Sequence, residues 1–349
     1  MKHLIWCLSL VSVGYSMTVT LGQPHPIIFD TDFALPPQDD ALALLLALNS
    51  PEIEILGITT VAGNKSRDQA TADALKVLEM VGCERIPVYA GAQRPLVHRA
   101  TDYARTHWGE WWTDARPVPP LGAFARTRPA GGTAVEFMVQ TVLRRPGEVT
   151  ILAIGPLTNI AEAIRRDPAF SKAVKRMVIM GGAIAALPDG AGNITPNAEF
   201  NFWVDPEAAR TVLRSGIPIE LSPLNVSRKT HFSNSEFERI VGVSNPTTRL
   251  LKDTMSAQFQ GAAAQSVSYF MYDQVAVASL IDPSLVVTID LHVDVDIHQG
   301  IDYGVCVGGA EIWPGAEGAS KVRVQYDLDW DRFIRLFVER LTSGRIGAP

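Results

Sequence analysis

Short runs rich in β-branched residues alternate with longer segments of helical periodicity once the chain has passed Pro26. The runs predict strands, and the segments between them predict helices with one apolar face. This alternation is typical of a mostly parallel sheet with helices packed against it. The predicted strands are residues 27–29, 53–60, 86–89, 149–154, 176–180 and 217–221. The predicted helices are residues 40–48, 66–81, 133–143, 159–166 and 206–214.

The C-terminal third of the chain continues with helices at 235–241, 247–265 and 274–280, alternating strands within 286–307 and at 321–326, and a closing helix at 330–341. The sequence therefore predicts an α/β fold: a single domain over residues 23–349, with a mostly parallel central sheet flanked by helices. In such sheets ligands bind outside the carboxyl ends of the strands. The loops that follow the predicted strands are thus the places to search for chemistry.

Residues 91–128 interrupt the alternation. This segment holds four prolines and the aromatic residues Trp108, Trp111 and Trp112. The proline content argues against a regular element, and the aromatic area argues against a disordered linker. We predict a lid or a packed loop.

The first 22 residues are typical of a signal peptide. Lys2 and His3 precede the apolar run 4–13, and small and polar residues follow up to Gly22. We expect export to the periplasm or secretion, without stable membrane insertion, because the second half of the uncharged span is too rich in Ser, Thr and Gly. If translation starts at Met17 instead, the same protein is cytoplasmic.

The charge balance bears on the class of ligand. The chain carries 31 Lys and Arg against 37 Asp and Glu, for a net charge of −6. It offers no basic surface for a phosphate backbone, so a nucleic-acid polymer is not expected as a partner.

The three cysteines, Cys7, Cys83 and Cys306, lack the spacing of a zinc site or a redox pair, and the sequence leaves open whether Cys83 and Cys306 pair.

Carboxylates crowd the loop after the first predicted strand, at Asp30, Asp32, Asp39 and Asp40. Two of them could cap the helix that follows, where the dipole favours negative charge. Capping leaves the others repelling one another unless a cation neutralises them. A set of carboxylate ligands suits Ca²⁺ or Mg²⁺ better than zinc.

Later loops offer groups that suit a sugar. Asn64 follows Gly63 after the second strand, and Asn193, Glu199 and Asn201 occupy a long loop after the fifth. Amides and carboxylates of this kind donate to and accept from hydroxyl groups.

Two further loops contain turn and cap signals. After the fourth strand, Gly155-Pro156 forces a sharp turn that could expose the carbonyl of Ile154, and Thr158 or Asn159 is expected to cap the next helix. Asp205-Pro206 predicts an N-cap followed by proline in the first helical turn.

The ordered set of these blocks resembles the inosine-uridine preferring nucleoside hydrolases, over residues 26–340. The blocks that carry the resemblance are Asp30-Thr-Asp32 with Asp39-Asp40, Thr-Val-Ala-Gly-Asn64, Ile-Gly-Pro-Leu-Thr-Asn159-Ile-Ala, Met-Gly-Gly182, Asn193 with Ala-Glu199-Phe-Asn201, Asp205-Pro-Glu-Ala-Ala, and Tyr272-Asp273 followed by Leu280-Ile-Asp282-Pro.

The resemblance implies a Ca²⁺ ion held by Asp32, Asp40, the carbonyl of Ile154 and Asp273, with Asp32 also the general base toward water. It implies that the substrate is a small ribonucleoside and that the protein is a homo-oligomer, a dimer or tetramer. Residues that match those holding the ribose are Asp39, Asn64, Asn193, Glu199 and Asn201, with Asp273 shared between the metal and the substrate.

The chain departs from the family pattern at two places. Six residues separate Asp32 from Asp39, where the family usually has fewer, so the loop must bulge if Asp32 and Asp40 share one ion. Members that protonate the base carry a His where this chain has Tyr272, and tyrosine is a poor acid but a good stacking surface.

The purine-specific members have an aromatic residue at the place of Tyr272. Trp108 or Trp111 could supply a second stacking face, and His107 matches a base-contacting His of the family. We therefore predict calcium-dependent hydrolysis of the N-glycosidic bond of ribonucleosides to ribose and free base, with purine nucleosides favoured. The alternatives are a ribosyl hydrolase for pyrimidine or modified nucleosides, and an exported nucleoside-binding protein without turnover.

Overall fold

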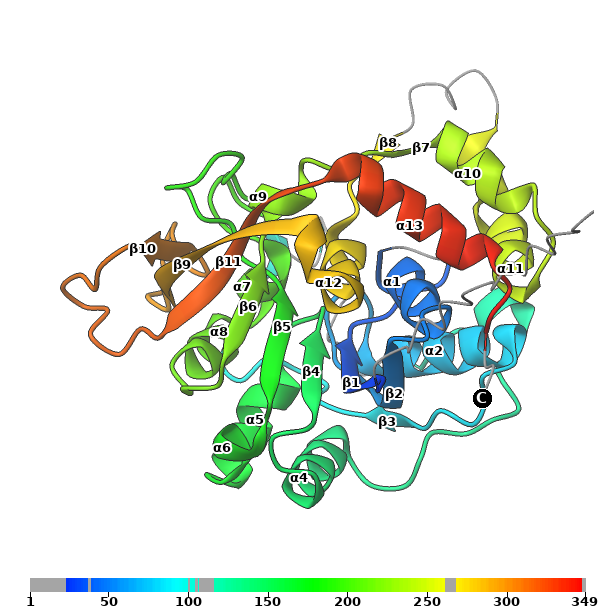
Figure 1. The fold of residues 1–349 in the computed structure, drawn as a ribbon. Helices are drawn as coiled ribbons and strands as arrows, with labels where there is room; N and C mark the ends of the chain where they lie inside the picture. Colours follow the sequence, from blue (N-terminus) through cyan, green and yellow to red (C-terminus); the bar gives the residue numbers. More distant parts are fainter. Residues whose placement is uncertain are drawn as a thin grey trace, which may run out of the picture.

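Nine strands form one central sheet in the computed structural model, which describes residues 23–36, 39–99, 101–103, 106, 116–260 and 268–346. The strand order is β10-β9-β11-β6-β5-β4-β1-β2-β3, and the strands from β3 to β11 run parallel (Figure 1). Antiparallel β9 and β10 complete one edge. The bounds are β1 His25–Thr31, β2 Ile53–Thr60, β3 Val88–Ala90, β4 Thr150–Ala153, β5 Arg176–Met180, β6 Ile219–Ser222, β9 Val286–Val295, β10 Cys306–Gly309 and β11 Lys321–Leu328.

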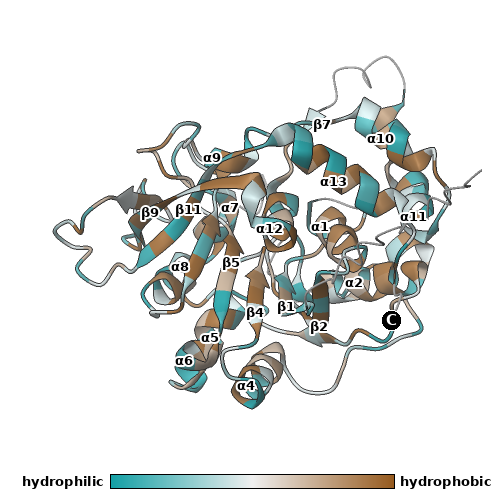
Figure 2. Cartoon of the chain, in the orientation of Figure 1, coloured by the Kyte–Doolittle hydropathy of each residue, from teal (hydrophilic) through white to brown (hydrophobic). Residues whose placement is uncertain are grey.

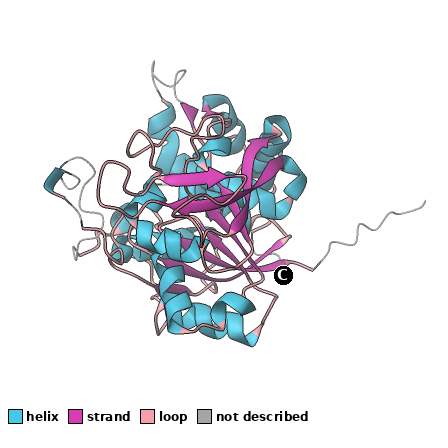
Figure 3. Cartoon of the chain, turned by 90° about the vertical axis from the view of Figure 1, so that its left-hand side faces the viewer, coloured by secondary structure: helices cyan, strands magenta, loops and turns pink. Residues whose placement is uncertain are grey.

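Helices cover both faces of the sheet, which twists between the two layers (Figure 3). Because successive side chains of a strand point to opposite faces, Ile27 and Phe29 of β1 join one apolar cluster and Ile28 joins the other. The first layer holds α1 Asp39–Leu48, α2 Arg67–Val81, α10 Asn234–Val241, α11 Pro246–Met255, α12 Tyr272–Ile281 and α13 Trp330–Thr342. The second holds α4 Ala134–Arg144, α5 Thr158–Arg166, α6 Phe170–Ala173 and α8 Pro206–Leu213.

The apolar residues face inward in both layers. The central strands are coloured as hydrophobic, whereas the helices carry hydrophilic residues on their outer sides (Figure 2). Cys83 and Cys306 are both buried and unpaired, so no disulfide joins them. In the part of the chain that the structure describes, no helix is long and apolar enough to cross a membrane.

The chain reverses its direction across the sheet between β1 and β4. From β1 it proceeds to β2 and β3 on one side, and from β4 to β5 and β6 on the other. Loops leaving β1 and β4 therefore diverge and open a crevice at the carboxyl ends of these strands, which is the usual ligand site of open α/β sheets. Asp32 follows β1 and Ile154 follows β4, so both lie at this crevice.

Short elements complete the fold around the crevice. They are α7 Phe200–Val204, α9 Leu224–Ser227, the two-residue strands β7 Phe232–Ser233 and β8 Ser268–Tyr269, and the 3-10 turns η1 Pro120–Gly122, η2 Ser256–Phe259 and η4 Pro283–Leu285. Apart from η2, which falls within the helix predicted at 247–265, none of these was predicted, because they are too short for a periodic pattern.

The predicted α/β fold with a mostly parallel sheet is confirmed, but one predicted helix is wrong in extent. The helix expected at 247–265 ends at Met255 and continues as η2. The hydroxyl of Ser256 donates to the carbonyl oxygen of Lys252, which offers the backbone an alternative to the helical ladder.

His107, Trp108, Trp111 and the proposed signal peptide, residues 1–22, lie outside the described residues.

Leu44→Ala tests the core beneath the crevice. Leu44 is fully buried on α1, so we expect the free energy of unfolding to fall by about 2–5 kcal/mol, because the lost side chain leaves a cavity. The same substitution at Leu143, which is 37% exposed on α4, should change it by about 0.5 kcal/mol or less. Urea denaturation of both variants measures the difference, and equal losses would contradict the assignment of Leu44 to the core.

Candidate active site

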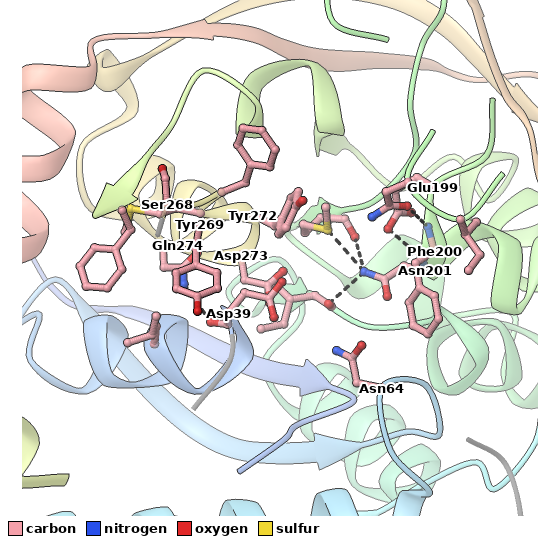
Figure 4. Close-up of a pocket in the computed structure, with 18 of the residues that line it drawn as sticks. Asp39, Asn64, Glu199, Phe200, Asn201, Ser268, Tyr269, Tyr272, Asp273 and Gln274 are labelled. Atoms are coloured by element: carbon pink, nitrogen blue, oxygen red, sulfur yellow. Dashed lines mark hydrogen bonds between the residues drawn. The ribbon is translucent and has the colours of Figure 1, made fainter. Parts of the chain in front are cut away.

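A cavity of about 690 Å³ lies at the carboxyl end of the sheet (Figure 4). Polar and acidic side chains line its inner part, and aromatic and apolar side chains line the rest. Most of the residues predicted for the site are on this lining: Asp39, Asn64, Ile154, Asn193, Glu199, Asn201, Tyr272 and Asp273. The chain thus brings residues from five separate segments to one place.

Asp32 and Asp40 lie behind this lining and are fully buried. Asp32 Oδ2 accepts a hydrogen bond from the backbone N–H of Asn64 at 2.5 Å. Asp40 accepts from the hydroxyl of Thr31 and, at 3.1 Å, from Nδ2 of Asn64. Both carboxyl groups accept from Asn64, so the lengthened loop between them does not keep them apart.

Two glycines permit the close approach of Asp32 to its neighbours. A Cβ atom on Gly63 would lie 2.1 Å from Asp32 Oδ2, and one on Gly155 would lie 2.8 Å from the Asp32 backbone nitrogen. Any other residue at either place would force Asp32 to move. On the far side, the N–H of Leu35 donates to Asp73 Oδ2 of α2 at 3.0 Å, which fixes the described part of the loop.

The carboxylates of Asp39, Asp40 and Asp273 offer oxygens that lie within 4.8 Å of one another. Burial raises the pKa of Asp32 and of Asp39 to about 7, with the charge of a neighbouring aspartate adding to the shift in each case. Burial, followed by repulsion from neighbouring carboxylates, raises the pKa of Asp40 and Asp273 well above the usual range. Ionisation of these carboxyl groups in the folded chain is therefore costly unless a positive charge lies beside them.

A metal ion fits this cluster. Asp32 Oδ1 is buried and has no hydrogen-bond partner, so one oxygen of the innermost carboxylate is left for a ligand. The donor atoms are all oxygens, which suits a hard divalent cation. The cluster of Asp39, Asp40 and Asp273 could therefore hold a metal. Sequence reasoning assigned Asp39 to the sugar, and the structure puts it both on the cavity lining and in the cluster with Asp40 and Asp273.

Glu199 and Asn201 are held by the backbone around them. The Glu199 carboxylate caps the short helix α7, accepting from the N–H groups of Asn201 at 2.8 Å and Phe202 at 3.1 Å, and it also accepts from Gly182 at 2.9 Å. Asn201 Nδ2 donates to the carbonyl oxygen of Ile154 at 3.1 Å. The capping role of Glu199 was not predicted, although the pattern Glu-Phe-Asn before an apolar turn could have indicated it.

Thr158 and Asn159 do not cap α5, contrary to the prediction from sequence. The N-cap is Leu157, and both polar side chains reach other elements instead. Thr158 Oγ1 donates to Asp205 Oδ2 at 2.7 Å, and Asn159 Nδ2 donates to Asp30 Oδ1 at 2.7 Å. Hydrogen bonds to distant residues thus replace the expected local cap. The predicted N-cap of α8 is confirmed, since Asp205 Oδ1 accepts from the N–H of Ala208 at 3.1 Å.

The outer part of the cavity is aromatic. Tyr269 and Phe270 line it beside Tyr272, and the rings of Phe270 and Tyr272 meet edge to face with centroids 6.0 Å apart. Burial, with a contribution from Asp39, raises the pKa of Tyr272 to about 12, so its phenol is neutral at pH 7. No histidine lines the cavity among the residues that the structure describes. The sequence singled out Tyr272 alone, although the run Tyr269-Phe270-Met271-Tyr272 signals an aromatic wall.

Comparisons with known proteins agree with this geometry. The family model for inosine-uridine preferring nucleoside hydrolases matches residues 27–335. The pyrimidine-specific ribonucleoside hydrolase RihB of Shigella flexneri is 35% identical over 315 residues, which span 88% of this chain and 95% of the relative. RihA of Citrobacter koseri, also named as pyrimidine-specific, is 35% identical over 319 residues, spanning 90% of this chain and 97% of the relative.

Solved structures of nucleoside hydrolases also superpose on this chain. The plant nucleoside hydrolase PpNRh1 superposes with a TM-score of 0.76 at 29% identity, covering 92% of this chain and 99% of that one. A purine-preferring ribonucleoside hydrolase from Gardnerella vaginalis superposes with a TM-score of 0.76 at 26% identity, covering 93% of this chain and 100% of that one. This chain belongs to the inosine-uridine preferring nucleoside hydrolase family, whose members are hydrolases acting on N-glycosyl compounds.

Proposed function

We propose that this ribonucleoside hydrolase depends on calcium and favours purine nucleosides, which it splits into ribose and free base. The observation that carries the calcium dependence is the buried carboxylate cluster beside the cavity, in which Asp39, Asp40 and Asp273 lie within 4.8 Å of one another and Asp32 keeps a free oxygen. A cation is the simplest way to stabilise such a cluster, and its oxygen ligands favour calcium over zinc.

The residues that would hold calcium are Asp32, Asp40, Asp273 and the carbonyl of Ile154. When bound, the ion supplies positive charge that neutralises the carboxylates, acidifies water beside it and orients the sugar hydroxyls. Asp39 faces the cavity in front of Asp40, which supports a role toward the substrate.

Asp32 is the proposed general base. Its Oδ2 accepts from the backbone of Asn64, whereas its Oδ1 has no hydrogen-bond partner, so this oxygen can contact the ion and also accept a proton from water. Cleavage of a ribosyl C–N bond passes through an oxocarbenium-like state, which nearby carboxylates stabilise by their negative charge. Removal of the proton turns water into a nucleophile strong enough to attack the anomeric carbon.

The sugar is held by the polar inner wall in this proposal. Side chains fixed by the backbone keep their orientation when the ligand binds, so little conformational freedom is lost. Asn201 is anchored at the carbonyl of Ile154, and Asn193 Oδ1 accepts from the N–H of Phe200 at 2.9 Å. The complete set toward the ribose is Asp39, Asn64, Asn193, Glu199, Asn201 and Asp273.

The aromatic wall supports the preference for purines. A purine offers a larger ring surface than a pyrimidine for stacking on Tyr272, and its ring nitrogens accept a proton as the base leaves. Tyr272 itself stays protonated and is a poor proton donor at neutral pH, because burial raises its pKa to about 12. His107, Trp108 and Trp111 remain predicted contacts to the base from the insertion.

Pyrimidine nucleosides are the second candidate substrates. The specific observation in their favour is that the curated relatives at 35% identity, RihB and RihA, are named as pyrimidine-specific. A purine-preferring enzyme superposes on this chain at lower identity. Release of ribose from inosine, guanosine, adenosine, uridine and cytidine decides between the two preferences.

Removal of calcium is the first test. We expect release of ribose from inosine to stop in excess chelator and to return on addition of Ca²⁺. We also expect the melting temperature to fall by several degrees in chelator, because a ligand at 100 times its Kd stabilises the folded state by about 2.7 kcal/mol. Both reducing-sugar release and calorimetry are measured on the protein from residue 23. Full activity in chelator, with an unchanged melting temperature, would exclude the metal.

Asp32→Ala tests the general base. We expect kcat to fall about 100- to 10,000-fold, as is typical when such a group is removed. The matched control is Asp253→Ala, an exposed aspartate on α11, for which we expect unchanged kcat. Circular dichroism establishes that both variants are folded. A kcat of Asp32→Ala within a factor of about ten of the wild type would rule out this role.

Tyr272 tests base selectivity. We expect Tyr272→Ala to lower kcat/KM for inosine roughly tenfold more than for uridine, corresponding to about 1.4 kcal/mol of stacking. Tyr272→Phe keeps the ring and should retain the preference of the wild type. Equal losses of kcat/KM for both nucleosides in Tyr272→Ala would remove the stacking argument. If Tyr272→Phe loses the preference for inosine as fully as Tyr272→Ala does, the hydroxyl and not the ring carries the role.

A further inference from the structure

The loop between β5 and α7 forms one wall of the cavity but contains little regular structure of its own. It leaves the sheet after Met180, passes Asp189 in a left-handed conformation with φ of 61°, and reaches the cavity at Asn193 and Ile194. Few backbone hydrogen bonds stabilise its middle part, residues 184–192. Something else must therefore hold this segment in place.

The short helix α9 supplies the missing contacts through two side chains, and Asn225 is the first. Asn225 is fully buried, and its Oδ1 accepts from the N–H of Ile184 at 3.0 Å. Its Nδ2 donates to the carbonyl oxygens of Ile184 at 3.1 Å and Pro188 at 2.7 Å. These bonds fix the first half of the segment.

Arg228, at the end of α9, holds the second half. Its Nη1 donates to the carbonyl oxygens of Asp189 at 2.8 Å and Ala191 at 2.5 Å, and its Nη2 donates to that of Gly192 at 2.8 Å. One guanidinium thus gathers three carbonyl groups in four consecutive residues. Arginine suits this task because its donors are fixed in a rigid, planar fork, whereas the single ammonium of lysine cannot span the same set.

The hydrogen bond from Arg228 to Gly192 lies one residue before Asn193, which lines the cavity. Gly192 is followed by Asn193, whose N–H donates to the carbonyl oxygen of Ala198 at 3.1 Å and whose Oδ1 accepts from Phe200 at 2.9 Å. A shift at Gly192 therefore passes to the segment that carries Glu199 and Asn201. Helix α9 is itself anchored at the start of this loop, since the N–H of Leu224 donates to the carbonyl oxygen of Gly182 at 2.9 Å.

We propose that Arg228 is a positioning residue for the sugar half of the site: it sets the loop at 189–192 so that Asn193 and the Glu199–Asn201 segment meet the ribose. The proposal rests on the assignment of these residues to the sugar under the proposed function. Arg228 does not line the cavity and is not a catalytic residue. The proposed effect is therefore on sugar binding, and Arg228→Lys keeps the positive charge that acts on Tyr272.

Arg228→Met and Arg228→Lys test this role. We expect both to raise KM for inosine and for uridine by the same factor, roughly tenfold, with kcat within about twofold of the wild type. Lysine fails as methionine does, because the fork and not the charge is required. The inhibition constant of free ribose should rise by the same factor, while those of hypoxanthine and uracil stay unchanged.

The matched control is Lys229→Met. Lys229 is the next residue and pairs with the carboxylate of Asp189 in the same loop at 3.4 Å, but this contact is to a side chain that is 48% exposed. Partly exposed ion pairs contribute little, so we expect KM to stay within about twofold of the wild type. Hydrogen exchange at the amides of Gly192 and Asn193 should be faster in Arg228→Met than in Lys229→Met.

Ribose binding separates this proposal from the proposed function. Calorimetric titration of ribose into the calcium-loaded wild type and Arg228→Met needs no turnover, so weaker binding to the variant supports the positioning role even if every nucleoside is hydrolysed slowly. Unchanged ribose binding and unchanged exchange at Gly192 would overturn it. A rise in KM for only one class of nucleoside would also overturn it, because the effect would then lie at the base.

Discussion

The rest of the site depends on the repulsion among carboxylates that the fold packs together at the end of β1. Asp32 and Asp40 are fully buried, and Asp39 and Asp273 lie beside them. Burial of one unpaired carboxylate costs several kcal/mol, and neighbouring charges of the same sign add to this cost. Such a cluster is stable only if its carboxylates are protonated or a cation lies beside them. This requirement links the stability of the loop to the chemistry that the cluster can perform.

The sheet topology explains why these groups meet. The chain reverses its strand order between β1 and β4, so the loops that carry Asp32 and Ile154 open on the same crevice. Gly63 and Gly155 then allow the backbone to close around Asp32, and Thr31 and Asn64 donate to the carboxylates. The acidic centre is therefore built mostly from contacts at strand ends, where few side chains have freedom to move.

Local sequence patterns were sufficient for most strands of the central sheet and for the carboxylates after β1, whereas Asp273 was implied by the family resemblance. The strands at 53–60 and 176–180 agree with the predicted bounds, because β-branched runs between turn signals are distinctive. The bonds from Thr158 to Asp205 and from Asn159 to Asp30 were not predictable in this way. They join residues distant in the sequence. The side chains of Thr158 and Asn159 therefore bond to buried partners instead of capping α5. The tether from Arg228 to the carbonyls of 189–192 is non-local in the same sense.

Under the proposed function the cavity has a sugar half and a base half, and different interactions stabilise the two. The sugar half consists of polar side chains anchored on backbone groups, as with Glu199 on α7, so a substitution there disturbs several hydrogen bonds at once. The base half consists of rings such as Tyr269, Phe270 and Tyr272, whose contacts are non-directional and tolerate exchange. Relatives with the same fold carry names with opposite base preferences. We propose that a constrained sugar half joined to a permissive aromatic wall underlies that divergence, because the wall can change without altering the carboxylate cluster.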